Sequence, residues 1–325
     1  MKALICEAFG PIENLQLKDM PSPQPGPGQL VVQMKSAGVN FPDALMVQGK
    51  YQVKPPFPFS PGGEIAGVVK AVGTGVKRFS VGDRVMALTS TGGFAQECLT
   101  EEARTLPLPQ GMDFDTGAAL MLTYCTSLHA LKDVGDLRPG ETLVVLGAAG
   151  GVGVSAIEIG KAMGASVIAA ASSEDKLAVC RQVGADETIN YSTENLKDRI
   201  NELTGGKGAD QVYDPVGGAY TEQALRATAW RGKLLVIGFA AGEIPRIPLN
   251  LALLRERQIL GVYWGDSTKH DPEGHQANLR QLEAWFVEGK IKPLVSERFP
   301  LERAREAIEL IANRGVKGKI VVVND

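Results

Sequence analysis

The sequence is poor in cysteine and histidine, the side chains that most often bind transition metals. It contains four cysteines and three histidines in 325 residues, and the cysteines are scattered without paired spacing. This pattern argues against a secreted scaffold held together by disulfides or a zinc cluster of closely spaced cysteines. We expect buried thiols and a reducing compartment, the cytoplasm.

The sequence also lacks an excess of positive charge and a long apolar run. The formal net charge is -3, which gives no electrostatic reason to bind nucleic acid or an anionic membrane. The N-terminus has a very short apolar run followed by Glu7 and Glu13, unlike a secretory signal. The apolar stretch at 143–157 is broken by glycines, whereas a membrane span needs roughly 20 apolar residues. We therefore expect neither a nucleic-acid nor a membrane partner.

The pattern of segments changes near residue 122, which agrees with two domains for a chain of this length. Before it, apolar runs at 30–34 and 65–72 alternate with turn-rich stretches, predicting an irregular, largely antiparallel β domain. Beyond it, alternating strands and helices predict a parallel, doubly wound sheet. The expected strands are 142–146, 166–171, 187–190, 211–214, 233–237 and 319–323, and the expected helices are 152–163, 174–183, 196–203, 221–229, 276–288 and 301–313.

The clearest chemical signal is the turn after the first strand of this sheet. It reads GAAGGVG over 147–153 and leads into a helix. The spacing A-x-G-x-x-G at 148–153 is the dinucleotide fingerprint with alanine at its first position. Such a turn lets backbone N–H groups approach a pyrophosphate at the helix N-terminus. We expect Gly150, Gly151 and Val152 to bind a cofactor there; the structural alternative is a tight turn without a ligand.

The end of the next strand indicates which dinucleotide binds. A site for NAD places Asp or Glu there to accept from the ribose 2′-OH, but this chain reads AAASSEDK over 169–176. Ser172 and Ser173 can donate to a 2′-phosphate, and Lys176 adds positive charge. The two acidic residues in this run either weaken a phosphate site or cap the helix, as Ser173 can also do. We therefore expect NADPH as the cofactor.

Several motifs together resemble the zinc-independent quinone oxidoreductase branch of the medium-chain dehydrogenase/reductase superfamily. In chain order they are Gly38-Val-Asn40 with Asp43, Gly63-Glu64, Val81-Gly-Asp-Arg-Val85, Ala149-Gly-Gly-Val-Gly153, Ser172-Ser-Glu-Asp-Lys176, Gly184-Ala-Asp186, Ile189-Asn-Tyr191, Asp214-Pro-Val-Gly-Gly218 and Gly238-Phe-Ala-Ala-Gly242. Gly261-Val-Tyr-Trp-Gly265 is similar to the quinone oxidoreductase-like subgroup. The resemblance implies an α/β chain with a GroES-like domain at 1–122 and 263–325, a Rossmann domain at 123–262, and a cleft between them.

The resemblance also implies roles for single residues. Lys176 and Tyr191 would contact the adenosine 2′-phosphate region, and Arg314 is a further candidate. The residues implied around the nicotinamide end or the phosphates are Thr123, Val216, Phe239, Ala240, Ala241, Trp264 and Gly265. The structural alternative for Tyr191 is capping of the sheet edge, and for Phe239 and Trp264 it is packing at an interface.

The zinc ligands of related alcohol dehydrogenases have no counterpart here. Those enzymes use a Cys after the first strands, a Gly-His-Glu motif and a later Cys. In this chain Asn40 stands at the first place, Gly62-Gly63-Glu64 stands at the second, and 89–97 lacks the cysteines of a structural zinc lobe. The histidines lie among apolar residues or five positions apart, which is poor chelating geometry. We expect no metal.

The expected lack of zinc restricts the substrate. Zinc polarises a carbonyl for hydride transfer, so without it the substrate must already be electron-poor, as quinones and α,β-unsaturated carbonyls are. We expect NADPH-dependent reduction of a quinone by hydride transfer, with the cofactor supplying the chemistry. One alternative is reduction of an activated C=C bond in an alkenal, enone or enoyl thioester. Another is a non-enzymatic, cofactor-binding role.

Two polar residues of the first domain are the expected catalytic residues. Asn40 and Tyr51 can donate a hydrogen bond to the substrate oxygen on which negative charge develops, and Thr123 is a third candidate. The structural alternatives are that Asn40 holds a turn and Tyr51 closes a loop. We also expect a homodimer, because 258–264 resembles an apolar strand at the edge of the sheet, and exposed edges tend to be paired or covered.

Overall fold

The chain folds into two compact units, and the computed structural model describes residues 1–324. The first unit contains Met1–Leu122 and the chain from Pro293 onward, and the second contains Thr123–Lys292. The sequence predicts the return to the first unit at residue 263. The return comes later, because the helices that follow this residue pack within the second unit, where Asn278 accepts a hydrogen bond from Lys132 at 2.7 Å.

The strands of the first unit form a seven-stranded sheet and a separate two-stranded pair. They are β1 (Lys2–Ile5), β2 (Gln16–Asp19), β3 (Gln29–Gly38), β4 (Glu64–Val72), β5 (Arg84–Leu88), β6 (Glu97–Glu101), β7 (Thr105–Pro107), β14 (Val295–Pro300) and β15 (Lys319–Val323). The order is β14-β15-β3-β4-β5-β7, and β6 also pairs with β3. Apart from the parallel pair β14–β15, the pairs are antiparallel, which confirms the expected β domain.

Strand β15 brings the end of the chain beside β3. Val321 pairs with Gly38, and the N–H of Val39 donates to the carbonyl oxygen of Ile320 at 3.1 Å. This register places Lys319, the first residue of β15, next to the loop that follows β3. The helical segments of this unit are α1 (Phe41–Val47), α10 (Ala304–Ala312), the first part of α2 (Phe114–Leu128), and the 3-10 turns η1 (Ile12–Asn14), η2 (Glu102–Arg104) and η4 (Leu301–Arg303).

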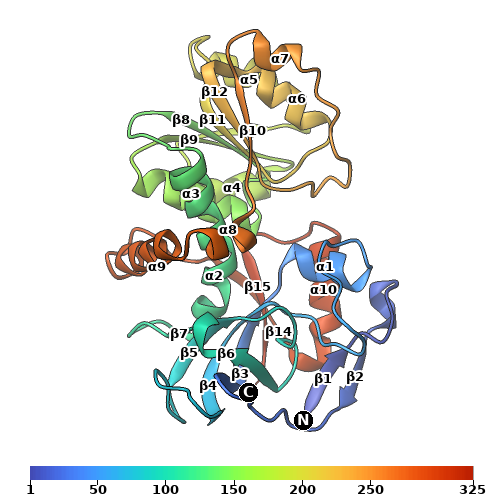
Figure 1. Ribbon diagram of the computed structural model, residues 1–325. Coiled ribbons are helices and arrows are strands. Elements are labelled where there is room, and N and C mark those ends of the chain that lie inside the picture. Colours follow the sequence, from blue (N-terminus) through green and yellow to red (C-terminus); the bar gives the residue numbers. More distant parts are fainter. Residues whose placement is uncertain (325) are drawn as a thin grey trace. The chain divides into compact units, whose positions relative to one another are not determined.

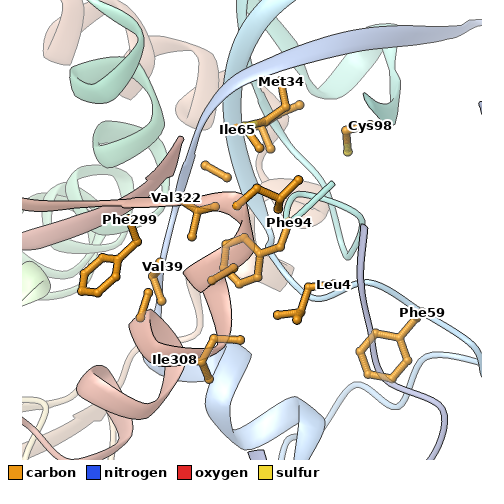
Figure 2. Packing of buried hydrophobic residues seen from close by; sticks show 14 of the residues in the cluster. Leu4, Met34, Val39, Phe59, Ile65, Phe94, Cys98, Phe299, Ile308 and Val322 are labelled. Atoms are coloured by element: carbon orange, nitrogen blue, oxygen red, sulfur yellow. The ribbon is translucent and has the colours of Figure 1, made fainter. Parts of the chain in front are cut away.

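Apolar side chains from the sheet and from α10 form the core of the first unit (Figure 2). Met34 of β3 and Ile65 of β4 lie against Phe94, which comes from a loop, and Val322 and Ile308 approach from β15 and α10. Inward residues alternate with outward ones along a strand, so each of these strands gives one face to this core.

The second unit is a six-stranded parallel sheet. Its strands are β8 (Thr142–Leu146), β9 (Ser166–Ala171), β10 (Glu187–Asn190), β11 (Ala209–Asp214), β12 (Thr228–Val236) and β13 (Gln258–Gly261). Their order, β10-β9-β8-β11-β12-β13, is that of a Rossmann fold, whose ligands bind beyond the carboxyl ends of the strands. The expected doubly wound sheet is confirmed.

Helices lie on both faces of this sheet (Figure 1). The helical segments of the unit are α3 (Gly151–Ala162), α4 (Glu174–Gln182), α5 (Leu196–Leu203), α6 (Ala219–Arg226), α7 (Asn250–Leu253), α8 (Trp264–His270) and α9 (Pro272–Val287), together with the end of α2 and a π-helical turn, η3 (His129–Val134). Leu196 and Ile200 of α5 and Leu225 of α6 pack with Val144 and Leu146 of β8 on one face. The opposite face of β8 meets α3.

The structure differs from the expected elements in several places. Helix α6 ends at Arg226 instead of continuing through 229, because the Thr228 hydroxyl donates to Leu225 O at 2.8 Å and β12 begins there. Strand β13 ends at Gly261, and the expected strand residue Trp264 instead begins α8. Helix α1, in a region that shows no helical periodicity, is only seven residues long.

Candidate functional site

The turn between β8 and α3 presents backbone rather than side chains. Gly147 has a φ of +56°, in the left-handed region that favours glycine, and α3 begins directly after Gly150. A Cβ atom at Gly153 would lie 2.5 Å from the carbonyl oxygen of Gly147, so the helix approaches the turn too closely for any larger residue. The first N–H groups of a helix have no partner within it. The turn therefore has the form that fits a pyrophosphate.

The residues expected to bind a 2′-phosphate gather where β9 and β10 end. The two strands are parallel neighbours, so their carboxyl ends lie at the same edge of the sheet. Lys176 donates to the hydroxyl of Ser172 at 3.3 Å, and Ser173 is the N-cap residue of α4. The hydroxyl of Ser173 donates to the carboxylate of Asp175. Tyr191 directly follows β10. The ammonium and hydroxyl groups at this edge suit a phosphate.

A buried carboxylate organises the loop after β11. Asp214 is 2% exposed and accepts hydrogen bonds from the N–H groups of Val216 at 2.8 Å and Gly217 at 2.9 Å. Its other oxygen accepts from the hydroxyl of Thr221 at 2.6 Å. Burial raises the pKa of this carboxyl, against the opposing effect of these hydrogen bonds. The side chain fixes the loop that carries Val216.

The loops after β11 and β12 lie side by side. The N–H of Ala240 donates to Pro215 O at 3.0 Å, and the N–H of Ala241 donates to Val216 O at 2.7 Å. Phe239 is 38% exposed next to these backbone contacts. The structure thus brings together four of the residues expected near the nicotinamide end, at the edge of the sheet where a Rossmann fold binds its ligand.

The other expected cofactor residues of the second unit lie on α2 and α8. Thr123 of α2 is buried, and its carbonyl oxygen accepts a hydrogen bond from Ser155 of α3 at 3.1 Å. Trp264 begins α8, with its ring centroid 5.8 Å from that of His275, and the exposed Gly265 follows it. Thr123 therefore lies against the helix that starts at the glycine turn.

Besides Asn40, two expected site residues belong to the first unit. Tyr51 follows α1, is partly buried, and packs against the apolar core. Arg314 follows α10 with a φ of +59°. The structure therefore groups Tyr51 and Arg314 with a different unit from the residues around the glycine turn.

A buried polar cluster in the first unit consists of Asn40, Asp43, Glu64 and Lys319. The Asn40 side chain donates to Glu64 Oε2 at 2.7 Å and more weakly to Gly38 O at 3.3 Å. Lys319 Nζ donates to Asn40 Oδ1 at 2.6 Å and to Glu64 Oε2 at 3.1 Å. We call these four residues the Asn40–Lys319 cluster.

Asp43 has an unusual environment within this cluster. Burial raises the pKa of its carboxyl to about 7, and Glu64 acts in the same direction. Hydrogen bonds from the N–H groups of Asn40 at 2.8 Å and Gly62 at 3.2 Å oppose this shift, as does the charge of Lys319. The carboxyl can therefore change its protonation state near neutral pH.

The sequence analysis assigned no role to Lys319 of this cluster or to Asp214 of the second unit. Lys319 is the one charged residue in the apolar run KIVVV over 319–323, and a lysine in such a strand is a signal for a buried ion pair. Asp214 begins the motif Asp214-Pro-Val-Gly-Gly218 and is the last residue of β11. Its position at the end of a strand indicates that it could hold the following loop.

The histidines take part in local contacts. The ring of His129 bonds Asp133 at 2.9 Å, and burial lowers the pKa of His275. Across residues 1–324, no three or more His, Cys, Asp or Glu side chains are grouped so that they could hold a metal ion.

Two family models match the chain. The model described as the alcohol dehydrogenase GroES-like domain matches residues 26–126, and the model described as zinc-binding dehydrogenase matches residues 151–281. The first match falls mainly in the first unit and the second match falls in the second unit. The expected combination of a GroES-like and a Rossmann domain is confirmed.

The chain is also similar to individual proteins along its whole length. It is 37% identical over 324 residues to the quinone oxidoreductase-like protein 2 homolog of Nematostella vectensis, covering 99% of this chain and 88% of that protein. It is 37% identical over 322 residues to the quinone oxidoreductase of Pseudomonas aeruginosa, covering 97% of each. The structure of Escherichia coli quinone oxidoreductase complexed with NADPH matches with a TM-score of 0.92 and 27% identity over 100% of both chains.

Proposed function

Because the chain belongs to the quinone oxidoreductase-like members of the medium-chain dehydrogenase/reductase superfamily, we propose that it reduces a quinone with NADPH and without a metal ion. The observation that carries this proposal is the identity to the Pseudomonas quinone oxidoreductase along 97% of both chains. The chain is an NADPH-dependent oxidoreductase. The quinone and the independence from zinc are the parts that need a test.

The second unit has the groups needed to hold NADPH. Gly150, Gly151 and Val152 offer N–H groups to the pyrophosphate at the start of α3. Ser172 and Lys176 offer a hydroxyl and an ammonium group to the 2′-phosphate. NADPH supplies the hydride when it is bound. The further proposed contacts are Ser173, Tyr191 and Arg314 toward the 2′-phosphate, and Thr123, Val216, Phe239, Ala240, Ala241, Trp264 and Gly265 toward the nicotinamide end and the phosphates.

The first unit supplies the proposed hydrogen-bond donors to the substrate. Reduction of a quinone places negative charge on its oxygen, and a positioned donor stabilises that charge. Tyr51 provides a phenol. One N–H of Asn40 is held by Glu64 at 2.7 Å, and the other makes only a long contact of 3.3 Å with Gly38. We assign this second N–H to the substrate oxygen.

The side chain at position 40 supports a mechanism without zinc. Asn40 stands where related enzymes carry their first cysteine ligand, and its amide oxygen already accepts a hydrogen bond from Lys319 at 2.6 Å. A neutral amide engaged in this way is a poorer zinc ligand than a thiolate. A quinone is electron-poor and accepts hydride without a Lewis acid, unlike a simple ketone.

A kinetic panel tests the proposed reaction. Purified protein is assayed with NADPH against quinones, enones, alkenals and an enoyl thioester, and kcat/KM is compared. We expect the quinones to give the highest values. Turnover of activated alkenes alone would assign the alternative reaction, reduction of a C=C bond. Tight binding of NADPH without turnover of any electrophile would assign a non-enzymatic role.

We also propose that two copies pair along β13. This strand is the last in its sheet and pairs with β12 on one side. Leu249, Leu253 and Ile259, in or near it, are 79%, 78% and 38% exposed. A second copy would cover both the strand edge and these apolar side chains.

The cysteines support a cytoplasmic location, which we propose for this enzyme. In the described part of the chain none of the four forms a disulfide, and all four are buried. Burial raises the pKa of Cys98 to about 12, so it stays a thiol. Cysteines outside disulfides are typical of a reducing compartment. Within residues 1–324, no helix combines the length and the apolar character needed to span a bilayer.

A further inference from the structure

Lys319 is a charged side chain at the edge of an apolar core. It is 4% exposed, and the rest of β15 consists of isoleucine and valine. Its ammonium donates to Asn40 Oδ1 at 2.6 Å, to Glu64 Oε2 at 3.1 Å and to Val39 O at 3.3 Å. These three acceptors match the three N–H bonds of an ammonium group. The buried charge is therefore paired, which a charge in a core requires.

Lys319 and Glu64 together determine which way the amide of Asn40 faces. The amide oxygen faces the ammonium, and the amide nitrogen donates to Glu64 Oε2 at 2.7 Å. Turning the amide over would place its NH2 group against the ammonium and its oxygen against the carboxylate, so both contacts would become repulsive. One orientation is thus strongly favoured.

The positive charge of Lys319 also acts on the two carboxyl groups of the cluster, Glu64 and Asp43. Glu64 is fully buried, and its other oxygen accepts from the N–H of Leu122 at 3.2 Å. Glu64 raises the pKa of Asp43, whereas Lys319 lowers it. Lys319 thereby favours the ionised form of Asp43, whose Oδ2 accepts from the N–H of Asn40 at 2.8 Å. Lys319 therefore stabilises both the side chain and the backbone of Asn40 in their places.

We propose that Lys319 is a positioning residue for the reaction: it holds the Asn40 amide so that an N–H, and not the amide oxygen, faces the substrate. This inference rests on the proposed function, because it takes Asn40 as the group that contacts the substrate. Lys319 acts through Asn40, and Glu64 serves as its buried counter-ion.

A double-mutant cycle tests the inference. Lys319→Met and Asn40→Ala should each lower kcat, for the electrophile that the wild type reduces, by on the order of a hundredfold. The KM for NADPH should not change, because the start of α3, Ser172 and Lys176, which are proposed to bind the pyrophosphate and the 2′-phosphate, belong to the other unit. The double variant should be no slower than the slower single variant. Losses that multiply in the double variant, or a wild-type kcat in Lys319→Met, would overturn the inference.

Matched variants separate positioning from folding. Lys319→Met alone leaves Glu64 as a buried unpaired charge, so Lys319→Met is also combined with Glu64→Gln, which removes both charges. This double variant should unfold cooperatively, and its kcat should still be lower than that of the wild type. A folded double variant with the wild-type kcat would overturn the inference. Lys70→Met, which removes a surface lysine paired with Glu97 in the same unit, should keep the wild-type kcat.

The side-chain amide of Asn40 gives a readout that needs no turnover. In the wild type its N–H resonances should exchange slowly with solvent, and Lys319→Met should accelerate this exchange by about tenfold or more, as expected when a buried hydrogen bond weakens. Unchanged exchange would overturn the positioning role. A wild type that reduces no quinone would instead overturn the proposed function, and the exchange measurement would still decide the role of Lys319.

Discussion

The ammonium of Lys176 is placed to distinguish NADPH from NADH. The two cofactors differ by one phosphate, and Lys176 lies beside Ser172 at the end of β9, where an NAD site would carry a carboxylate. A charge-assisted hydrogen bond to a phosphate is stronger than a neutral one. The preference for NADPH should therefore depend on this side chain.

Lys176→Ala should weaken NADPH binding by roughly 1–3 kcal/mol, because a hydrogen bond between charged groups is lost. NADH binding should change little, since NADH lacks the phosphate. Titration of both nucleotides by calorimetry measures the two dissociation constants. Lys197→Ala, on the exposed side of α5, is the matched control. Equal losses for the two cofactors would contradict the assignment.

Glu158 links protonation to stability. It lies buried in α3, where it accepts hydrogen bonds from the hydroxyl of Tyr124 and from the N–H of Lys292. Burial raises the pKa of Glu158 to about 7, although these bonds oppose the shift. In the unfolded chain the pKa of a glutamate carboxyl is about 4.3. Between this pH and pH 7, the folded state therefore binds more protons than the unfolded state. The resulting stabilisation is complete below the unfolded value and is lost as pH rises through 7.

Glu158→Gln should remove this pH dependence, because glutamine keeps the acceptor without the charge. The free energy of unfolding of the variant, relative to that of the wild type, should rise by roughly 1–3 kcal/mol between pH 4 and 8 on the scale of such shifts. Urea unfolding at a series of pH values measures it. Glu273→Gln, at an exposed position, should follow the wild type. Parallel curves for Glu158→Gln and the wild type would show that Glu158 does not cause the pH dependence.

Gly150 and Gly153, at the start of α3, have different structural roles. A Cβ atom at Gly153 would meet Gly147 O at 2.5 Å, whereas one at Gly150 would lie 3.4 Å from that atom, an ordinary contact, and Gly150 has a φ of −78°. Gly153 is therefore needed for packing the helix against the strand, and Gly150 for the approach of the pyrophosphate.

Substitution of each glycine by alanine should separate the effect on stability from the effect on NADPH binding. Gly153→Ala should lower the free energy of unfolding by roughly 1–3 kcal/mol, because the added methyl group overpacks the turn. Gly150→Ala should leave stability within about 1 kcal/mol of the wild type but weaken NADPH binding about tenfold or more, because the methyl group separates the phosphate from the N–H groups. Thermal unfolding and calorimetry measure the two effects. The reverse pattern would contradict this division.

The elements with a strong local pattern were predicted well. The bounds of β8, β9, α5 and β15 agree with the sequence analysis, because apolar runs and turn residues mark their ends. Helix α1 was missed, since seven residues are too few to show a period. Strand β12 was misjudged because Arg231, with a φ of +59°, lies inside it, and its start at Thr228 looks helical in sequence.

The two parts of the candidate site were predictable to different degrees. The cofactor groups around α3 and β9 lie within a few tens of residues of each other, so a local motif reveals them. The Asn40–Lys319 cluster depends on a contact between residues 279 positions apart, which only the pairing of β15 with β3 creates. Sequence reasoning could single out Asn40 but could not find its partner.

Assembly should depend on the edge strand β13. Ile259→Lys places a charge among exposed apolar side chains and should convert a homodimer to monomers. Light scattering after gel filtration gives the mass. Lys197→Ala should leave the mass unchanged. A monomeric wild type would show that the exposed edge has another explanation.

The central claim is that the chain reduces a quinone with NADPH in a site that needs no metal. The most direct test removes metal from the purified protein with a chelator, verifies the metal content, and follows oxidation of NADPH by a quinone through its absorbance. The account predicts an unchanged kcat/KM for the quinone. A rate that disappears with the metal and returns on addition of zinc would contradict it.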